Sequence, residues 1–216
     1  MKEKIKEKIK NIDYSLYLVT NRENKTNSEF LNIIEEAILG GVTVVQIREK
    51  TAPTGEFYKI AKETKKITDS YDIPLIINDR LDVALAIDAS GVHVGQSDMP
   101  AQIVRDIIGE EKILGVSAAT IETAISAEKD SADYIGSGAI SPTKTKDADC
   151  ISLDYLKKIV DSVNIPVIAI GGISEDTVNL LDKTEIKGIS VVSAIMNSYD
   201  PKKSSKNLKN EFNKLK

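Results

Sequence analysis

The segment Val-Val-Gln-Ile-Arg-Glu-Lys, residues 44–50, joins a short apolar run to a group of polar and charged side chains. A similar polar cluster recurs further along the chain within residues 75–80, 92–98, 141–146 and 168–173. If the apolar runs are parallel strands, each polar cluster falls at the carboxyl end of a strand. In a parallel barrel those ends share one face, which is the face that carries catalysis. The segment therefore predicts both a parallel fold and the position of its site.

Short β-branched runs, polar loops and helical patterns follow one another along the whole chain. The predicted strands cover residues 15–20, 42–47, 73–78, 91–94, 112–116, 134–136, 167–170 and 188–191. Between them apolar residues recur at helical spacing, as in the stripe of Phe30, Ile34 and Ala37. Strands that alternate with helices indicate βαβ units and a parallel sheet. We therefore predict an α/β fold, a single (βα)8 TIM barrel.

A doubly wound open sheet is the competing fold. The pair Gly171-Gly172 after a predicted strand fits either fold, but the G-x-G-x-x-G fingerprint does not follow the first strand. Polar residues at the expected helix starts support the assignment of helices. We expect Ser28, Thr54 and Ser174 to cap three of them.

The length of 216 residues and the 41% hydrophobic content fit one domain with a substantial core. Within residues 1–216 we expect a short N-terminal extension (1–13), the barrel (14–198) and a final helix (202–216). The single cysteine, Cys150, excludes an internal disulfide and is more often incidental than catalytic.

The net charge of −4 argues against a general binder of nucleic acid or membranes, because such binding needs a basic field. No stretch approaches the roughly 20 apolar residues of a membrane span. The first residues alternate Lys and Glu and lack the apolar core of a signal peptide. We therefore expect a cytoplasmic protein with small-molecule partners, and a homo-oligomer is compatible with the sequence.

Two carboxylates follow neighbouring predicted strands. Asp79 ends the third strand and Asp98 lies just past the fourth, so both can reach one site. Ligation by oxygen alone, with room for water and phosphate oxygens, suits Mg²⁺ better than zinc. Each residue taken alone could equally cap a helix, Asp79 before Arg80 and Asp98 before Pro100.

Cations gather at the same predicted rim. Arg48 and Lys50 stand two residues apart in an extended backbone, so they project to the same side. Such a pair can hold a diphosphate, since the guanidinium forks two oxygens and the ammonium adds a mobile charge. The alternative is a solvated strand end with Glu49 as the ion-pair partner.

The remaining candidates supply amides, hydroxyls and backbone groups. Gln46 and Asn78 offer amides and Ser117 a hydroxyl, whereas residues 142–146 form either a turn or a flexible lid that carries Lys146. Gly172 and Ser193 follow the last two strands, where barrels often bind phosphate, although plain turn residues fit as well. The only histidine, His93, reads as a packed residue or as a general base.

The chain resembles the thiamine-phosphate synthase family, whose members are (βα)8 barrels. The resemblance runs from about Leu16 to Ile195. The matching blocks are residues 45–50, 77–80, 91–100, 142–146, 170–173 and 192–195. Two positions depart from the usual family pattern: Ser90 stands where an acidic residue is usual, and Ser141 where a bulky apolar one is.

The resemblance implies a transferase that joins an aminopyrimidine carrying a methylene diphosphate to a thiazole carrying a phosphoethyl arm. Thiamine phosphate forms and diphosphate leaves, with Mg²⁺ held by Asp79 and Asp98. The implied substrate-binding residues are Gln46, Ile47, Arg48, Glu49, Lys50, Asn78, Ser117, Thr143, Lys144, Thr145, Lys146, Gly172, Val192 and Ser193. The implied catalytic residues are Arg48, Lys50, Ser117 and Lys146.

Two other functions remain open. A thiazole tautomerase-like relative would isomerise the thiazole phosphate and would not need diphosphate-binding groups. A non-catalytic barrel that senses a phosphate ligand would share the fold without the chemistry. The joint presence of Arg48, Lys50, Asp79, Asp98 and Lys146 favours the synthase over both.

Overall fold

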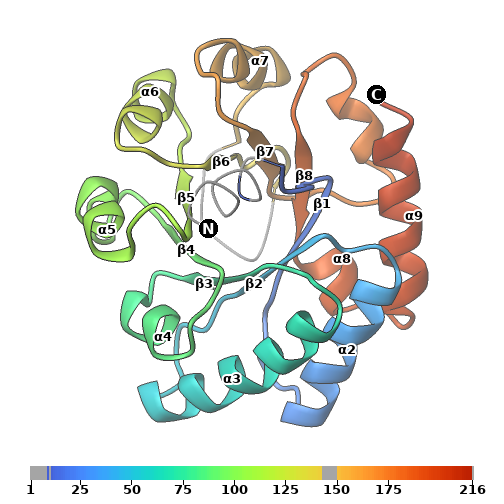
Figure 1. The fold of residues 1–216 in the computed structure, drawn as a ribbon. Coiled ribbons are helices and arrows are strands. Elements are labelled where there is room, and N and C mark those ends of the chain that lie inside the picture. Colours follow the sequence, from blue (N-terminus) through green and yellow to red (C-terminus); the bar gives the residue numbers. More distant parts are fainter. Residues whose placement is uncertain (1–8, 10, 143–149, 216) are drawn as a thin grey trace.

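A closed barrel of eight parallel strands forms the centre of the molecule, so the (βα)8 prediction is confirmed. This computed structural model describes residue 9 and residues 11–142 and 150–215. Each strand pairs with the next, and β8 closes the ring on β1 (Figure 1). The strands are β1 (Leu16–Val19), β2 (Val44–Ile47), β3 (Leu75–Asn78), β4 (Gly91–Val94), β5 (Ile113–Ser117), β6 (Tyr134–Ser137), β7 (Val167–Ile170) and β8 (Gly188–Val191).

Helices surround the ring on its outside (Figure 1). They are α2 (Asn27–Leu39), α3 (Thr54–Ser70), α4 (Leu81–Ala86), α5 (Ala101–Ile108), α6 (Ile121–Lys129), α7 (Leu153–Asp161), α8 (Ser193–Met196) and α9 (Pro201–Asn213). The connection from β7 to β8 carries a short 3-10 helix instead, η1 (Val178–Leu181). The chain ends with α9 packed beside α2. The contact is close, since a Cβ on Gly40 would lie 2.3 Å from the Lys202 carbonyl oxygen.

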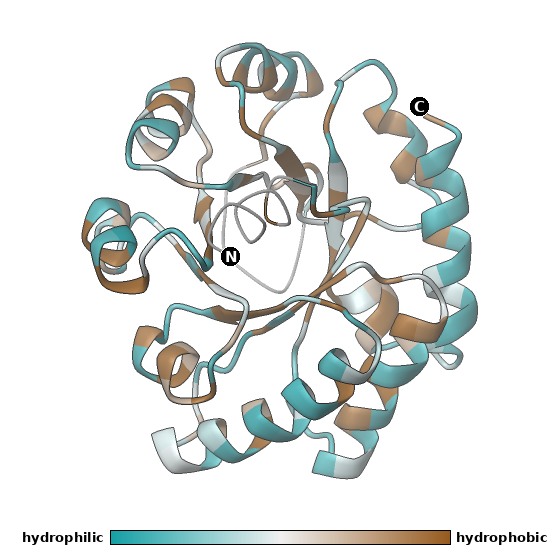
Figure 2. Ribbon diagram, viewed as in Figure 1, coloured by the Kyte–Doolittle hydropathy of each residue, from teal (hydrophilic) through white to brown (hydrophobic). Residues whose placement is uncertain are grey.

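Two apolar cores result from the alternation of side chains along the strands. Outward-facing residues such as Leu18 and Ile77 pack against the helices, whose apolar faces turn toward the strands (Figure 2). Inward-facing residues fill the barrel. They are Tyr14, Tyr17, Val19, Val44, Ile76, Ile113, Tyr134 and Ile168, with Ile9 and Ile12 packed against them. The described part of the leader thus contributes to the barrel interior.

The predicted helix caps were wrong. Thr26, and not Ser28, caps α2, because its hydroxyl accepts from the Glu29 amide while the Glu29 carboxylate accepts from the Thr26 amide, at 3.2 and 2.8 Å. This reciprocal box needs an acidic or amide side chain three residues after the cap, which Ser28 does not have. Thr54 is the first residue of α3, after Pro53, and its side chain caps nothing.

Ser174 likewise begins no α-helix. The Thr177 hydroxyl accepts from the Ser174 amide at 2.9 Å and donates to the Gly172 carbonyl at 3.1 Å. Side-chain bonds of this kind give the backbone an alternative to helical pairing. The connection from β7 to β8 therefore contains only the short 3-10 helix η1.

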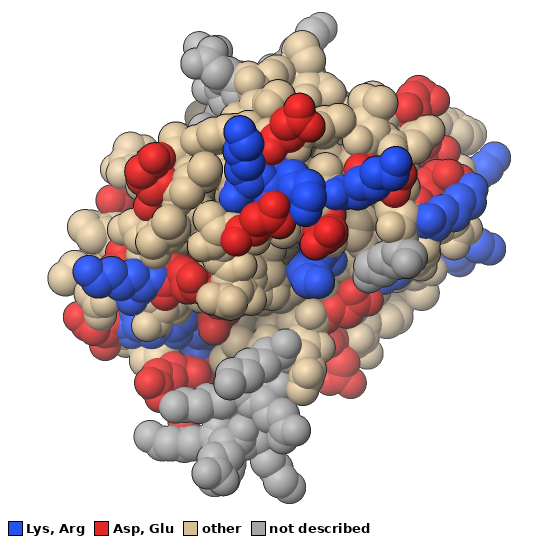
Figure 3. All heavy atoms as spheres, turned by 90° about the horizontal axis from the view of Figure 1, so that it is seen from above, with Lys and Arg blue, Asp and Glu red and all other residues tan. Residues whose placement is uncertain are grey.

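Two findings concern the molecular surface. In the described part of the chain, no helix is long and apolar enough to cross a membrane. On the face shown in Figure 3, basic and acidic side chains lie among one another, in keeping with the net charge of −4.

Candidate active site

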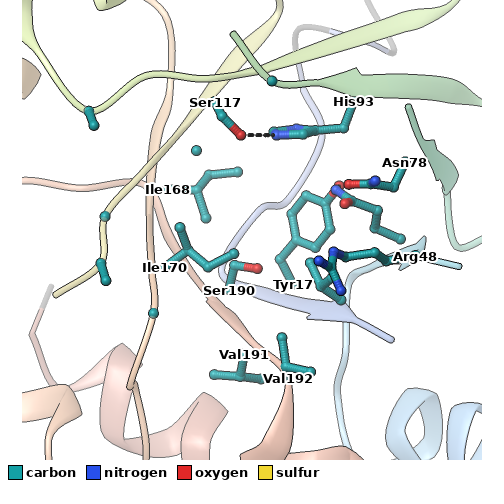
Figure 4. A pocket seen from close by; sticks show the side chains of 18 of the residues that line it. Tyr17, Arg48, Asn78, His93, Ser117, Ile168, Ile170, Ser190, Val191 and Val192 are labelled. Carbon is teal, nitrogen blue, oxygen red and sulfur yellow. Dashed lines mark hydrogen bonds between the residues drawn. The ribbon is translucent and has the colours of Figure 1, made fainter. Parts of the chain in front are cut away.

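A cavity of about 450 Å³ opens at the carboxyl ends of the strands. Every strand of the barrel contributes to its wall. In Figure 4 the polar side chains of His93, Asn78 and Arg48 lie on one side, and Ile168 and Ile170 lie on the other. The cavity therefore has a polar and an apolar side, a combination common in small-molecule sites.

Most of the predicted site residues that the structure describes line this one cavity. They are Gln46, Arg48, Lys50, Asn78, Asp79, Asp98, Ser117, Gly172, Val192 and Ser193. Two predicted residues do not line it: Ile47 is buried in the outer core, and Glu49 pairs with Arg22. Thr143, Lys144, Thr145 and Lys146 lie outside the described residues.

Arg48 is available for a ligand. Its backbone amide is held by the Thr20 hydroxyl at 3.2 Å, which fixes the end of β2. Its guanidinium has no hydrogen-bond or ion-pair partner within residues 11–142 and 150–215. Glu49, the alternative partner of this cation, binds the Arg22 Nε at 2.9 Å instead. The solvated ion pair that the sequence left open is therefore not formed.

Asp79 and Lys50 meet at the rim. The Lys50 ammonium donates to Asp79 Oδ2, so a predicted anion-binding cation and a predicted metal ligand are in direct contact. Asp79 adopts a left-handed backbone conformation, with φ of 60°, and its amide donates to the His93 carbonyl at 2.8 Å. Aspartate tolerates this conformation better than most residues. The side chain caps no helix, since α4 has no side-chain cap.

Asp98 stabilises the turn after β4. Its Oδ2 accepts from the Gly95 amide at 2.7 Å, and its own amide donates to the Gly95 carbonyl at 3.2 Å. The helix α5 begins after Pro100 without a side-chain cap, so Asp98 does not play the capping role. Asp79 and Asp98 are thus two carboxylates of neighbouring strand ends on one cavity.

A continuous chain of hydrogen bonds crosses the polar floor of the cavity. The Gln46 Nε2 donates to the Tyr17 hydroxyl at 2.7 Å, and the hydroxyls of Tyr17 and Tyr134 are 2.7 Å apart. The Tyr134 hydroxyl lies 2.9 Å from His93 Nδ1, and His93 Nε2 lies 2.9 Å from the Ser117 hydroxyl. Burial raises the pKa of Tyr17 and of Tyr134 well above their ordinary value, so both stay protonated.

Glycines in the neighbouring strands make room for this chain. A Cβ on Gly115 would lie 2.5 Å from His93 Nδ1 and 2.1 Å from Tyr134 Cζ. A Cβ on Gly136 would lie 3.3 Å from His93 Cε1. Glycine weakens a strand interior and often marks such a close approach. These two positions therefore serve the side chains between them.

Sequence reasoning missed several residues of the cavity wall. Tyr17, Tyr134, Ile168 and Ser190 line it, and His93, read mainly as a packed residue, lines it as well. Alternation along the strands carried a signal, because each of these residues occupies an inward position. The Ser190 hydroxyl is buried without a hydrogen-bond partner among the described residues, so it offers an unused donor to a ligand.

The loop after β7 approaches the cavity through backbone alone. Gly171 and Gly172 have φ of 96° and 69°, a region that disfavours other residues. A Cβ on Gly172 would lie 2.6 Å from the Cβ of Ser141, so a bulky residue at position 141 would crowd this loop further. The second departure from the family pattern, Ser90, accepts from the Leu75 amide at 3.1 Å and thereby joins the starts of β3 and β4.

Comparisons with known proteins agree with this geometry. The family model described as thiamine monophosphate synthase matches residues 16–195. Thiamine-phosphate synthase of Methanobrevibacter smithii is 59% identical over 203 residues, which cover 94% of this chain and 97% of the relative. The enzyme of Clostridium tetani is 56% identical over 205 residues, or 94% and 98%. The solved thiamine phosphate pyrophosphorylase from Pyrococcus furiosus matches with a TM-score of 0.87 at 41% identity, covering 94% and 98%.

Proposed function

The chain belongs to the thiamine monophosphate synthase family, and we propose that its barrel mouth joins a pyrimidine diphosphate to a thiazole phosphate. It is a transferase of thiamine biosynthesis. In the proposed reaction the bond between the pyrimidine methylene carbon and the diphosphate oxygen breaks, and its electron pair leaves with the diphosphate. The thiazole nitrogen then forms a bond to that carbon with its lone pair. The products are thiamine phosphate and diphosphate.

The observation that carries this proposal is the convergence of cations and carboxylates on one cavity. Arg48, Lys50, Asp79 and Asp98 follow the ends of three neighbouring strands and line the same cavity. A departing diphosphate gains negative charge, and preorganised cations stabilise that charge without reorganisation. Arg48 forks two phosphate oxygens and Lys50 adds a mobile charge. Lys146 is proposed as a further contact, although it lies outside the described residues.

Amides and hydroxyls would position the rings. Gln46, Asn78 and Ser117 are proposed to bind the pyrimidine, because they line the cavity. Gly172, Val192 and Ser193 are proposed to hold the thiazole phosphate through backbone amides and one hydroxyl. Holding both reactants in line supplies up to roughly 7–11 kcal/mol in favourable systems. Ile47 and Glu49 do not line this cavity, which leaves them no proposed side-chain contact.

The donor set fits a magnesium ion. Asp79 and Asp98 supply oxygen ligands on one cavity, and no group of three or more His, Cys, Asp or Glu residues surrounds them in the described chain. Two carboxylates with open positions suit Mg²⁺, which keeps waters and takes phosphate oxygens. When bound, it would neutralise charge on the diphosphate. The Lys50 ammonium contacts the Asp79 carboxylate in this structure, so Lys50 and Mg²⁺ would share that carboxylate.

The side chains also favour a dissociative order of events. The cavity presents the cations Arg48 and Lys50, which can stabilise the leaving diphosphate before the thiazole nitrogen bonds to the methylene carbon. The electron-rich aminopyrimidine can stabilise the cation left after diphosphate departs. Electron-withdrawing substituents on the pyrimidine should therefore slow the reaction. Equal rates for substituted and unsubstituted rings would refute this order.

Product analysis tests the function directly. The enzyme is incubated with the pyrimidine diphosphate, the thiazole phosphate and Mg²⁺, and the mixture is analysed by mass spectrometry. Thiamine phosphate with an equal amount of diphosphate is the expected result. An isomerised thiazole phosphate would establish the tautomerase instead, and two unchanged substrates that nevertheless bind would establish a sensor.

A further inference from the structure

The hydrogen-bonded chain from Gln46 to Ser117 has a direction, and that direction determines what the cavity offers to a ring. We propose that Tyr17, Tyr134 and His93 are positioning residues that make Gln46 an acceptor and Ser117 a donor toward the pyrimidine. This inference rests on the proposed function for the identity of the ligand. The direction itself follows from the contacts alone.

The Gln46 side-chain amide determines the donor-to-acceptor direction of the chain. Gln46 Nε2 donates to the Tyr17 hydroxyl, and the other partner of that hydroxyl among the described residues is Tyr134. Tyr17 has one hydroxyl hydrogen, so it donates to Tyr134. The opposite order would leave the Tyr17 hydrogen buried without an acceptor, which is unfavourable.

The same assignment of hydrogens extends from Tyr134 to Ser117. Tyr134 accepts from Tyr17, so its own hydrogen goes to His93 Nδ1, 2.9 Å away. A neutral imidazole that accepts at Nδ1 carries its hydrogen on Nε2. His93 Nε2 therefore donates to the Ser117 hydroxyl, 2.9 Å away (Figure 4). The hydrogen of Ser117 remains available to a ligand.

Both ends of the chain line the cavity. At one end the Gln46 amide keeps Oε1, an acceptor, outside the chain. At the other end Ser117 keeps a hydroxyl donor, while Gln96 Nε2 holds its carbonyl at 2.8 Å. The pair is complementary to a ring edge that carries an amino group beside an unprotonated nitrogen. A 4-oxo ring with a protonated neighbouring nitrogen presents the opposite pattern at both points.

Every hydrogen bond of the chain is needed to distinguish a 4-amino from a 4-oxo ring, because each one decides whether the next group donates or accepts. Loss of the Tyr134 hydroxyl would separate Gln46 from His93 and let the imidazole take either tautomer. Ser117 could then serve as donor or acceptor. Tyr14 provides a matched control: its ring packs against that of Tyr134 with centroids 5.0 Å apart, and its buried hydroxyl has no partner among the described residues.

The single histidine allows a direct measurement. Nitrogen-15 labelling of histidine gives the NMR signals of His93 alone, and the tautomer is read from which ring nitrogen is protonated. We expect hydrogen on Nε2 in the wild type and in Tyr14→Phe, and a mixture of tautomers in Tyr134→Phe. Hydrogen on Nδ1 in the wild type would mean the reverse direction and would overturn the proposal.

Ligand discrimination gives the functional readout. Dissociation constants are compared for phosphonate analogues of the aminopyrimidine diphosphate and of its 4-oxo counterpart, neither of which can release diphosphate. The wild type should prefer the amino ring by about 100-fold or more, as sites built around polar contacts do. Tyr134→Phe should lower that preference by about tenfold, whereas Tyr14→Phe should leave it unchanged.

Further controls separate positioning from folding and from the function itself. Thermal unfolding should report folded protein for both variants, and Tyr17→Phe should reproduce the loss of preference if Tyr134→Phe does not fold. An unchanged preference in a folded Tyr134→Phe or Tyr17→Phe variant would overturn the proposal. Failure to form thiamine phosphate would refute the proposed function alone, because the tautomer of His93 is measured without substrate.

Discussion

Arg48 and Arg105 stand at opposite ends of the barrel and differ in how their charge is used. Arg105, on α5, lies at the base, the end of the barrel where the strands begin, and is 8% exposed. Its guanidinium donates to the carbonyls of Ser131, Gly109 and Lys112 and to the carboxylate of Asp133. Arg48, at the mouth, has a guanidinium without a partner among the described residues. A guanidinium whose hydrogen-bond donors are all used stabilises the fold, whereas one with unused donors can bind an anion.

The same contrast holds for the other charges of the two faces. At the base, Lys112 pairs with Asp88 at 2.6 Å, and Lys209 pairs with Asp13 at 2.9 Å. At the mouth, Lys50 pairs with Asp79, but both also line the cavity. The ion pairs at the base of the barrel therefore contribute to stability. The mouth retains charged groups that can bind a substrate and a metal ion.

The largest expected effect is on the mouth. Arg48→Ala should lower kcat/KM by about 100- to 1,000-fold, because one preorganised contact to the developing charge is lost. The free energy of unfolding should change by less than about 0.5 kcal/mol, since Arg48 stabilises no described neighbour through its guanidinium. Steady-state kinetics and urea unfolding measure the two quantities, and Arg48→Lys should recover part of the rate.

The matching change at the base should have the opposite profile. Arg105→Ala leaves Asp133 and three carbonyls without their buried partner and should destabilise the fold by about 3–5 kcal/mol. The activity of the folded fraction should be unchanged. A variant that keeps its stability but loses activity would contradict the division between mouth and base.

The carboxylates sharpen the comparison next. Asp98→Asn retains an acceptor for the Gly95 amide but removes the charge, so the Mg²⁺ concentration for half-maximal activity should rise about 10- to 100-fold. Asp88→Asn, at the base, should leave that concentration unchanged. Magnesium titrations of both variants provide the measurement. Equal magnesium dependence in wild type and Asp98→Asn would remove the metal assignment.

The smallest effect concerns acid stability at the base. Although burial alone would raise the pKa of Asp13, hydrogen bonds from Ser15 and Lys209 lower it from 3.8 to about 2. A lowered pKa stabilises the fold above the unfolded value, and this contribution is lost as the pH falls from about 4 to about 2. The side chain is 58% exposed, so the contribution is below about 1 kcal/mol.

Thermal unfolding of Asp13→Asn tests that sign. The variant should be slightly less stable than the wild type at pH 6, and the difference should vanish as the pH approaches 2. A difference that grows in acid would mean that Asp13 is stabilised in its protonated form.

The sequence was sufficient for the strands and for most of the site. All eight predicted strands exist within about two residues at each end, a usual precision for boundaries. The polar clusters were predictable because parallel strands end on one face, so position along the chain determines position in the site. Their position after a predicted strand was enough to place Arg48, Asp79 and Asp98 in one site, without any measured distance.

The remaining features depend on contacts that no local pattern encodes. Thr26 replaces Ser28 as a cap because Glu29 completes a reciprocal pair, and the Thr177 hydroxyl bonds within the turn that stands in place of the helix expected at Ser174. The relay of Tyr17, Tyr134 and His93 joins three separate strands. Its only local sign was glycine within strands, which is equally typical of bulges and of bends at barrel corners.

Calorimetric titration with inorganic diphosphate tests the central claim, that the mouth binds a diphosphate through Arg48 and a divalent ion. The account predicts magnesium-dependent binding to the wild type and to Lys112→Ala, a variant at the base, and binding weakened by about 10- to 100-fold in Arg48→Ala, the loss expected of a charged hydrogen-bonding contact. Equal affinity of Arg48→Ala and the wild type for diphosphate would contradict it.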